Sequence, residues 1–390
     1  MPVERLFTSE SVTEGHPDKV CDRISDAVLD AVFDQDPEAR VACEVFAPGG
    51  SSIIVGGELT TSAYVDLQKI VAEALCDIGY DKPEYGLDYR TISISNLIKE
   101  QSPDIAQGVT GDGMYQEKGA GDQGIMFGFA IAGEGDEYMP LPISMAHQLA
   151  RQLAQVRKAG IIPYLRPDGK TQVTVEYNEQ GKPIGIHTVV VAAQHDDGIE
   201  HGQIVEDIKR EVILPVAGGL VNRATKYFIN ATGKFVIGGP AGDTGLTGRK
   251  IIVDTYGGGT HKRTAGHGGG AFSGKDPTKV DRSGAYMLRK IAKSVVAAGF
   301  AQECEIQVSY VIGRADPLSL AVNTYGTGVM TDEDLAGIIR EEFDLQPEGI
   351  IKGLDLRRPI YAPTAAYGHF GRPEFPWEGL DKVKDLQRHM

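Results

Sequence analysis

The chain has 390 residues, of which 41% are hydrophobic and 24% charged, a composition typical of a soluble globular enzyme with two or three domains. Its 54 acidic and 39 basic side chains give a formal net charge of −15, which argues against nucleic acid and anionic membranes as partners. No apolar run reaches membrane-spanning length, the N-terminus lacks the apolar stretch of a signal peptide, and the four cysteines are far apart. We therefore expect a cytoplasmic protein with reduced thiols.

Helix and strand patterns recur along the chain in one order. Apolar spacing predicts a helix over 17–35, strands over 40–46 and 52–60, and a helix with Leu67, Val71, Ala74, Leu75 and Ile78 on one face. The order of helix, strand, strand and helix returns twice, at 144–159, 172–177, 185–194 and 199–213, and at 283–299, 304–312, 318–325 and 332–343. This spacing predicts an α+β protein of three similar units, with domains over 1–102, 113–236 and 238–375. Mixed proteins also alternate their elements without any repeat, so both interpretations stay open here.

The glycine-rich segment 268–283 is followed at once by a helical pattern and holds both signs of charge, including Lys275, Lys279 and Asp281. Glycine lets backbone approach a ligand, lysine binds phosphate, aspartate can hold a divalent metal, and helix N-termini favour anions. Residues 269–275 fit a P-loop, but Asp276 replaces its Ser or Thr, and the nearest strand-like run, at 250–256, ends too early. The alternatives are a polyphosphate site of another design, an atypical P-loop-like NTPase, a non-catalytic nucleotide-binding module and a structural glycine loop.

A second candidate lies at the start of the first helix. His16, Asp18 and Lys19 place a proton donor, a metal ligand and a cation together there, although a lone histidine is usually structural. By contrast, segment 165–170 (Leu-Arg-Pro-Asp-Gly-Lys) has the pattern of a plain turn, and the long polar segment 101–121 has that of a lid.

A third candidate is segment 238–250. Five glycines surround Asp243, and the segment ends in the adjacent cations Arg249 and Lys250. A solvated loop would not need that density of glycine, so we interpret the segment as a phosphate-facing loop.

Three long motifs, in order, carry a resemblance to a known family. They are the N-terminal run TSESVTEGHPDK at 8–19, the hexapeptide GAGDQG at 119–124, and GAFSGKDPTKVDRS at 270–283, with lesser matches at 41–44, 229–235 and 366–371. The chain resembles the methionine adenosyltransferase (S-adenosylmethionine synthase) family over nearly its whole length.

The resemblance implies formation of S-adenosylmethionine from ATP and L-methionine, with tripolyphosphate released from C5′ and then cleaved to diphosphate and phosphate. It implies three similar α+β domains about a pseudo-three-fold axis, and a homodimer with shared active sites, often a dimer of dimers. It also implies two magnesium ions per site and a potassium ion. The nucleophile is a thioether sulfur without a proton, so no general base is needed, and catalysis rests on alignment and on stabilising the leaving oxygen.

The resemblance also implies roles for individual residues. The catalytic group would be His16, Lys170, Arg249 and Lys275. The residues around ATP would be His16, Asp168, Lys170, Lys234, Phe235, Asp243, Arg249, Lys250, Ala271 and Lys275. Methionine would contact Glu58, Gln101, Asp243 and Lys279, magnesium would bind Asp18 and Asp281, and potassium would bind Glu44. Segment 101–121 would be a gating loop, and residues 259–267 look like an insertion that either adds phosphate contacts or forms an exposed loop.

Overall fold

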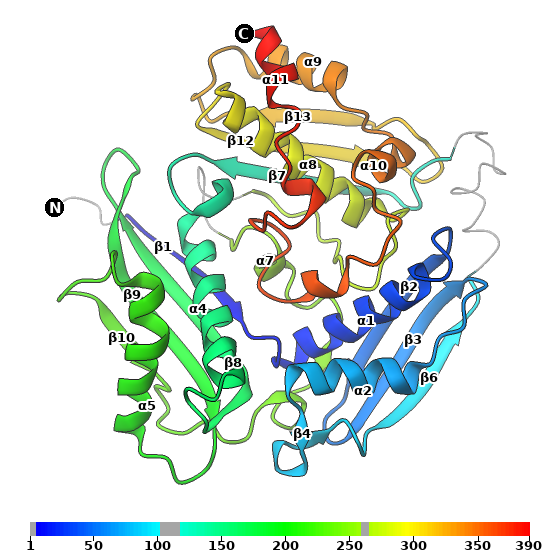
Figure 1. Ribbon diagram of the computed structural model, residues 1–390. Coiled ribbons are helices and arrows are strands. Elements are labelled where there is room, and N and C mark those ends of the chain that lie inside the picture. The colour runs from blue at the N-terminus through cyan, green and yellow to red at the C-terminus, as the bar shows by residue number, and fades with distance from the viewer. Residues whose placement is uncertain (1–4, 102–117, 259–264) are drawn as a thin grey trace.

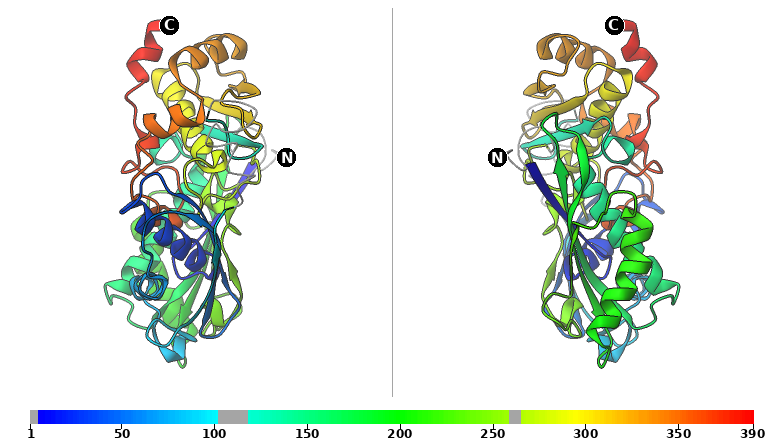
Figure 2. Two further views of the ribbon diagram at one scale, coloured as in Figure 1. Left: turned by 90° about the vertical axis from the view of Figure 1, so that its right-hand side faces the viewer. Right: turned by 90° about the vertical axis from the view of Figure 1, so that its left-hand side faces the viewer.

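The computed structural model describes residues 5–101, 118–258 and 265–390. It is an α+β fold of three larger sheets, each with helices on one face, arranged around a common centre (Figure 1). In the side views the sheets lie toward one side of the molecule and most helices toward the other (Figure 2). The α+β class and the three repeated units predicted from the sequence are confirmed.

The three sheets and their helices are as follows. One sheet has the order β11 (Gly245–Leu246), β2 (Arg40–Ala47), β3 (Ser52–Thr60) and β6 (Ser93–Lys99), with α1 (Pro17–Phe33) and α2 (Leu67–Ile78). The second has β1 (Arg5–Val12), β8 (Leu165–Tyr177), β9 (Pro183–His195) and β10 (Lys226–Ile229), with α4 (Leu141–Lys158) and α5 (His201–Ile208). The third has β13 (Ser319–Asn323), β12 (Glu303–Tyr310) and β7 (Gly124–Ile131), with α8 (Val280–Ala298) and α9 (Asp332–Glu342).

Side-chain alternation explains why each sheet is covered on one face. Along β2, Val41, Cys43, Val45 and Ala47 are buried, whereas Glu44 and Phe46, which alternate with them, are exposed. Because successive strand residues point to opposite faces, the first set packs under α1 and the second lies on the open face. The open face therefore presents exposed side chains instead of core residues.

The three units are linked by strands that pair with a sheet formed mainly by a distant part of the chain. β1, from the N-terminus, pairs along its length with β8, and β7 pairs with β12 of the third sheet. The sequence patterns did not predict β1, β6, β7 or β10, because their partners lie far away in the chain. The domain boundaries at 1–102, 113–236 and 238–375 stay predictions, since sheet membership does not follow the order of the chain.

Two local predictions were wrong. Residues 165–170, interpreted as a turn, begin strand β8, where pairing with β1 and β9 overrides the local Pro-Asp-Gly signal. The strand-like run 250–256 contains a short helix, α7 (Ile251–Asp254), in which Asp254 N donates to Lys250 O at 2.9 Å. Residues 102–117 of the predicted gating loop and 259–264 of the predicted insertion lie outside the described residues. Over the described ranges, no helix combines the length and apolar character needed to cross a membrane.

A row of aspartates along α1 anchors the loops that build the site. Asp18, Asp22, Asp26 and Asp30 recur every four residues and so share one face of the helix. They accept backbone N–H bonds, in turn, from Leu246 at 3.1 Å, Gly248 at 2.8 Å, Gly274 at 2.8 Å and Tyr361 at 2.9 Å. Three separate segments are therefore fixed to one helix.

Candidate active site

His16 stands at the N-terminal end of α1 and is almost fully buried. Its Nδ1 accepts a hydrogen bond from the backbone N of Asp18 at 3.2 Å, as an N-cap residue does. Burial, together with the nearby cations Lys250 and Lys170, lowers the pKa of His16 to about 3. The ring is therefore neutral near pH 7, and the bond at Nδ1 assigns its proton to Nε2.

Asp18 is the second member of this group. Lys250 Nζ lies 2.6 Å from Asp18 Oδ2, and Leu246 N donates to Oδ1 at 3.1 Å. Burial alone would raise the pKa of Asp18, but these two bonds outweigh it and lower the pKa below its usual value. Beneath it, buried Lys19 binds Asp22 at 2.9 Å and also pairs with Asp254.

Strand β8 contributes Asp168 and Lys170 to this group. Asp168 Oδ2 accepts a bond from Gly239 N at 2.8 Å, while its buried Oδ1 has no protein partner. Burial is the main cause that raises the pKa of Asp168 to about 6; Lys170 opposes the shift and Asp243 adds to it. Segment 238–250 and strand β8 thus converge near His16.

The pKa of Asp168 predicts a pH effect on stability. The folded protein keeps this proton up to about pH 6, whereas the unfolded chain loses it near 3.8, so the free energy of unfolding falls as pH rises through that window. Asp168→Asn removes the titration. Relative to that variant, the native protein should lose about 1.4 kcal/mol between pH 5 and pH 7. Urea unfolding at both pH values tests this, and parallel pH profiles would contradict it.

The close packing at Gly15 leads to a second prediction, which concerns the position of His16. A Cβ at this position would lie 2.3 Å from Pro167 O, because the turn before His16 runs directly against β8. Gly15→Ala must therefore push apart the turn that holds His16 and the start of β8, and a shift of ~1 Å at a reacting group can lower activity ~100-fold. Gly202→Ala, where a Cβ meets nothing within 4 Å, is the matched control. Steady-state kinetics of both variants provide the test; equal activity would refute the positioning role.

The loop residues expected around the nucleotide do not all lie together. Phe235 lies near Asp168, because Gln194 accepts a bond from Asp168 N at 3.3 Å and also contacts Gly238 beside the Phe235 ring. Lys234 instead forms an exposed ion pair with Asp197 at 2.7 Å. Arg249 is exposed next to Lys250, and the Gly248 backbone approaches Ala271, so the two glycine-rich loops touch.

A second group gathers at the start of α8. Lys275 Nζ lies 2.7 Å from Asp281 Oδ2, and Lys279 pairs with buried Asp276. Asp276 also accepts bonds from Val41 N at 2.7 Å and from Thr278 Oγ1 at 2.6 Å. The residue that departs from a P-loop thus ties the loop to β2.

The remaining predicted residues, Glu44, Glu58 and Gln101, lie on or just after strands of the first sheet. Partial desolvation raises the pKa of Glu44, with Lys275 opposing and Glu58 adding to the shift, so these charges are neighbours. Glu58 lies 3.7 Å from Lys99, and Gln101 Oε1 accepts a bond from Arg40 at 2.8 Å. All of these groups are available to a polar ligand.

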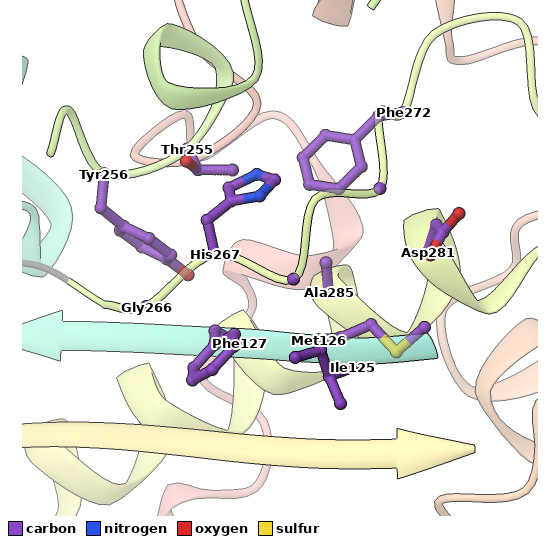
Figure 3. A pocket seen from close by; sticks show the side chains of 12 residues that line it. Ile125, Met126, Phe127, Thr255, Tyr256, Gly266, His267, Phe272, Asp281 and Ala285 are labelled. Atoms are coloured by element: carbon purple, nitrogen blue, oxygen red, sulfur yellow. The ribbon is translucent and has the colours of Figure 1, made fainter. Parts of the chain in front are cut away.

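A hollow of roughly 290 Å³, including its open mouth, lies beside Asp281. Figure 3 shows the His267 ring between the side chains of Tyr256 and Phe272, with Asp281 at the end of α8. Gly270 borders Asp281 so closely that a Cβ there would lie 2.3 Å from the carboxyl carbon. Glycine is required at this position to leave room around the carboxylate.

The structure thus builds two groups in one chain. The first contains His16, Asp18, Asp168, Lys170 and Lys250, and the second contains Glu44, Glu58, Lys275, Lys279 and Asp281. In the described parts of the chain, no hydrogen bond or ion pair joins a member of one group to a member of the other. The described residues also hold no cluster of three or more His, Cys, Asp or Glu side chains suited to a metal ion.

Asp22, Asp26 and Asp254 support both groups, and the sequence argument missed them. The four-residue spacing of aspartates in helix 17–35 is visible in the sequence, but such spacing usually marks a solvated helix face. Only the structure shows that Asp18, Asp22 and Asp26 of this helix are buried.

Comparison with protein families agrees with the geometry. The N-terminal domain of S-adenosylmethionine synthetase matches residues 4–103, its central domain matches 117–235 and its C-terminal domain matches 237–379. The three matches follow each other in order and leave only short segments uncovered. The chain therefore belongs to the S-adenosylmethionine synthetase family, the methionine adenosyltransferases, which form S-adenosylmethionine from ATP and L-methionine.

Proposed function

We propose that tripolyphosphate leaves ATP at C5′ with His16 Nε2–H donating to the departing oxygen. One observation carries this assignment: a buried, neutral imidazole with its proton on Nε2 lies between the cations Lys250 and Lys170. The methionine sulfur forms the new bond to C5′, the C5′–O bond breaks, and its electron pair stays on the tripolyphosphate. A positioned donor strengthens as charge develops on that oxygen, and removing such a donor typically lowers the rate by ~10²–10³.

The cations of both groups would hold the phosphates. Lys170, Arg249, Lys250 and Lys275 would gather positive charge locally in a chain whose net charge is −15, and tripolyphosphate held among them would then be hydrolysed to diphosphate and phosphate. Asp168 and Phe235 would frame the nucleotide together with Ala271, while Lys234 would have to leave its ion pair with Asp197 to join them.

Asp18 and Asp281 fit the role of magnesium ligands beside a polyphosphate. Each carboxylate is paired with one lysine, Lys250 or Lys275, and each lysine can turn to phosphate and free its oxygen for the ion. Magnesium commonly takes one or two carboxylates and completes its shell with phosphate oxygens and water. The ions would neutralise phosphate charge. Glu44, on the open face of the first sheet, is the candidate potassium ligand.

Two subunits would complete each site. The exposure of Phe46, Leu97 and Ile125 on the open sheet faces favours a homodimer that joins these faces. Methionine would then bind Glu58, Gln101, Asp243 and Lys279, and a dimer of dimers is a further assembly of the same kind. A cytoplasmic location stays a prediction from the sequence.

An assay of products tests the proposed reaction. Purified protein is given ATP and magnesium, with and without L-methionine, and S-adenosylmethionine, tripolyphosphate, diphosphate and phosphate are measured. Methionine-dependent formation of S-adenosylmethionine with diphosphate and phosphate supports the proposal. Equal ATP consumption without methionine would favour the P-loop-like NTPase instead.

Lys275→Ala should lower kcat by more than ~10-fold, because one charged contact to a polyphosphate contributes more than the ~1.4 kcal/mol that equals tenfold in rate. Its effect on folding should be small, since Lys275 is partly exposed and pairs only with Asp281 among acids of the described chain. Lys69→Ala, at an exposed helix position, is the control. Unchanged turnover would show that Lys275 is a residue of a solvated loop and does not contact phosphate.

A further inference from the structure

The turn that carries His16 into α1 is held from two sides. Strand β8 bounds one side, where Thr13 N donates to Gly169 O at 2.9 Å. The segment that follows α2 bounds the other side, where the hydroxyl of Tyr80 donates to Gly15 O at 2.6 Å. Both residues of this second bond are buried. The position of His16 therefore depends on a side chain from a distant part of the chain.

The backbone of Tyr80 is itself fixed. Gly79 ends α2 with a φ of +102°, and Tyr80 N then donates to Leu75 O at 2.9 Å, which is the pattern of a Schellman cap. On the other side, Tyr89 N donates to Tyr80 O at 3.0 Å. The ring is fully buried in the core, and a buried tyrosine hydroxyl normally finds a hydrogen-bond partner. The helix cap and the core together aim this hydroxyl at the turn.

The same hydroxyl packs against the loop that binds Asp168. Gly239 has a φ of +59°, and a Cβ at this position would lie 2.1 Å from the Tyr80 oxygen. Gly239 N donates to Asp168 Oδ2 at 2.8 Å. Burial raises the pKa of Tyr80 above its usual value and Asp168 adds to the rise, so the phenol keeps its proton and stays a donor near pH 7. One oxygen thus supports both the turn of His16 and the backbone that holds Asp168.

A second link joins the end of α2 to this turn. Arg157 of α4 donates through Nη2 to Ile78 O at 2.7 Å and to Glu14 Oε1 at 3.1 Å. Because Glu14 precedes Gly15, the turn is attached at two successive residues. Residues of this kind, which lock a reacting side chain in place from behind, decide how precisely it meets its substrate.

We infer that Tyr80 is a positioning residue for the departure of tripolyphosphate, which sets where His16 Nε2 lies relative to the nucleotide that Asp168 would frame. This role depends on the proposed donor function of His16 and adds to it a residue that acts through the turn. A donor must lie within hydrogen-bond reach of the leaving oxygen. Without the bond from Tyr80, the turn can relax and the donor meets that oxygen less well, although every group that would bind ATP is still present.

Tyr80→Phe removes the hydroxyl and keeps the ring. It should lower kcat for S-adenosylmethionine formation about tenfold, less than the ~100-fold that a full 1 Å shift can cause. KM for ATP and for methionine should stay within about twofold, and so should the cleavage of added tripolyphosphate, in which no C5′–O bond breaks. Steady-state kinetics of both reactions, measured on one preparation, provide the test. Equal losses in the two reactions would indicate a general loss of folded enzyme and would overturn the positioning role.

Tyr310→Phe is the matched control. Tyr310 is also buried, and its hydroxyl donates to a backbone carbonyl, Leu345 O, at the same distance of 2.6 Å, but it belongs to the third sheet. The two variants lose the same kind of bond, so thermal unfolding should show similar destabilisation. Only Tyr80→Phe should lower kcat. An equal fall of kcat in both variants would show that the loss of any such buried bond is sufficient, and would contradict a specific role for Tyr80.

Combining Tyr80→Phe with His16→Ala shows whether Tyr80 acts through His16. In the double variant, Tyr80→Phe should lower kcat by no more than about twofold beyond the loss caused by His16→Ala. A further tenfold loss would show that Tyr80 acts apart from His16 and would overturn its assigned role. If His16→Ala is slow but Tyr80→Phe keeps the native kcat, the role of Tyr80 is refuted and the donor role of His16 stands. If His16→Ala itself keeps the native kcat, both roles are refuted.

Discussion

Replacing His16 by alanine should lower kcat for S-adenosylmethionine formation by ~10²–10³ and change KM little. The reason is that a donor aimed at the leaving oxygen acts mainly in the transition state, where charge develops. Cleavage of added tripolyphosphate should fall less, because the C5′–O bond is not broken in that step. Comparing the two rates in one variant separates a role at C5′ from a general loss of phosphate binding.

His16→Asn separates the loss of the donor from the loss of the helix cap. Asparagine is also a favoured N-cap residue, so it can accept the bond from Asp18 N and hold the start of α1. It should fold normally and yet remain strongly impaired, because its amide is shorter than the imidazole. His187→Asn, at a residue of β9 outside both groups, is the control. If His16→Ala kept its rate within a few-fold of the native enzyme, the proposed donor role would be wrong.

Arg282→Leu should destabilise the protein by ~3–5 kcal/mol, the usual cost of leaving a buried charge without its partner. Arg282 is fully buried and donates to both oxygens of Asp26, at 2.7 and 2.8 Å. It also donates to Lys275 O at 3.1 Å, so this pair fixes the phosphate-facing loop to α1.

A double-mutant cycle shows whether the pair acts as a unit. Asp26→Leu combined with Arg282→Leu should cost less than the sum of the single changes, because the second change removes the stranded charge. Arg358→Leu, at an exposed pair with Asp355, should cost less than about 1 kcal/mol and serves as the matched control. A loss below that level for Arg282→Leu in denaturant unfolding would contradict the anchoring role.

Local signals were sufficient for most of the fold. Periodicity predicted the first two helices and their two intervening strands. At the start of α9, Thr331 Oγ1 accepts a bond from Asp334 N at 3.1 Å, as a local N-cap does. Pairing between distant segments was not visible. Lys170 faces Val12 across the β1–β8 ladder, and that contact converts an apparent turn into a strand. No local pattern encodes such a partner.

The site was predictable in its members but not in its arrangement. Motifs identified His16, Asp18 and Lys275, yet only the fold shows that Lys250 pairs with Asp18 while Lys275 pairs with Asp281. The position of Lys234, in an exposed ion pair, is likewise a property of the folded chain.

Complementation of inactive variants tests the central claim that each site joins the two groups from different subunits. His16→Ala and Lys275→Ala proteins are co-expressed with different tags, and the doubly tagged assembly is assayed for S-adenosylmethionine formation. A mixed dimer would contain one site with both substitutions and one with neither, so the doubly tagged dimer should have roughly half of the native activity. Activity no higher than that of the separate variants would show that both groups act within one chain and would contradict the account.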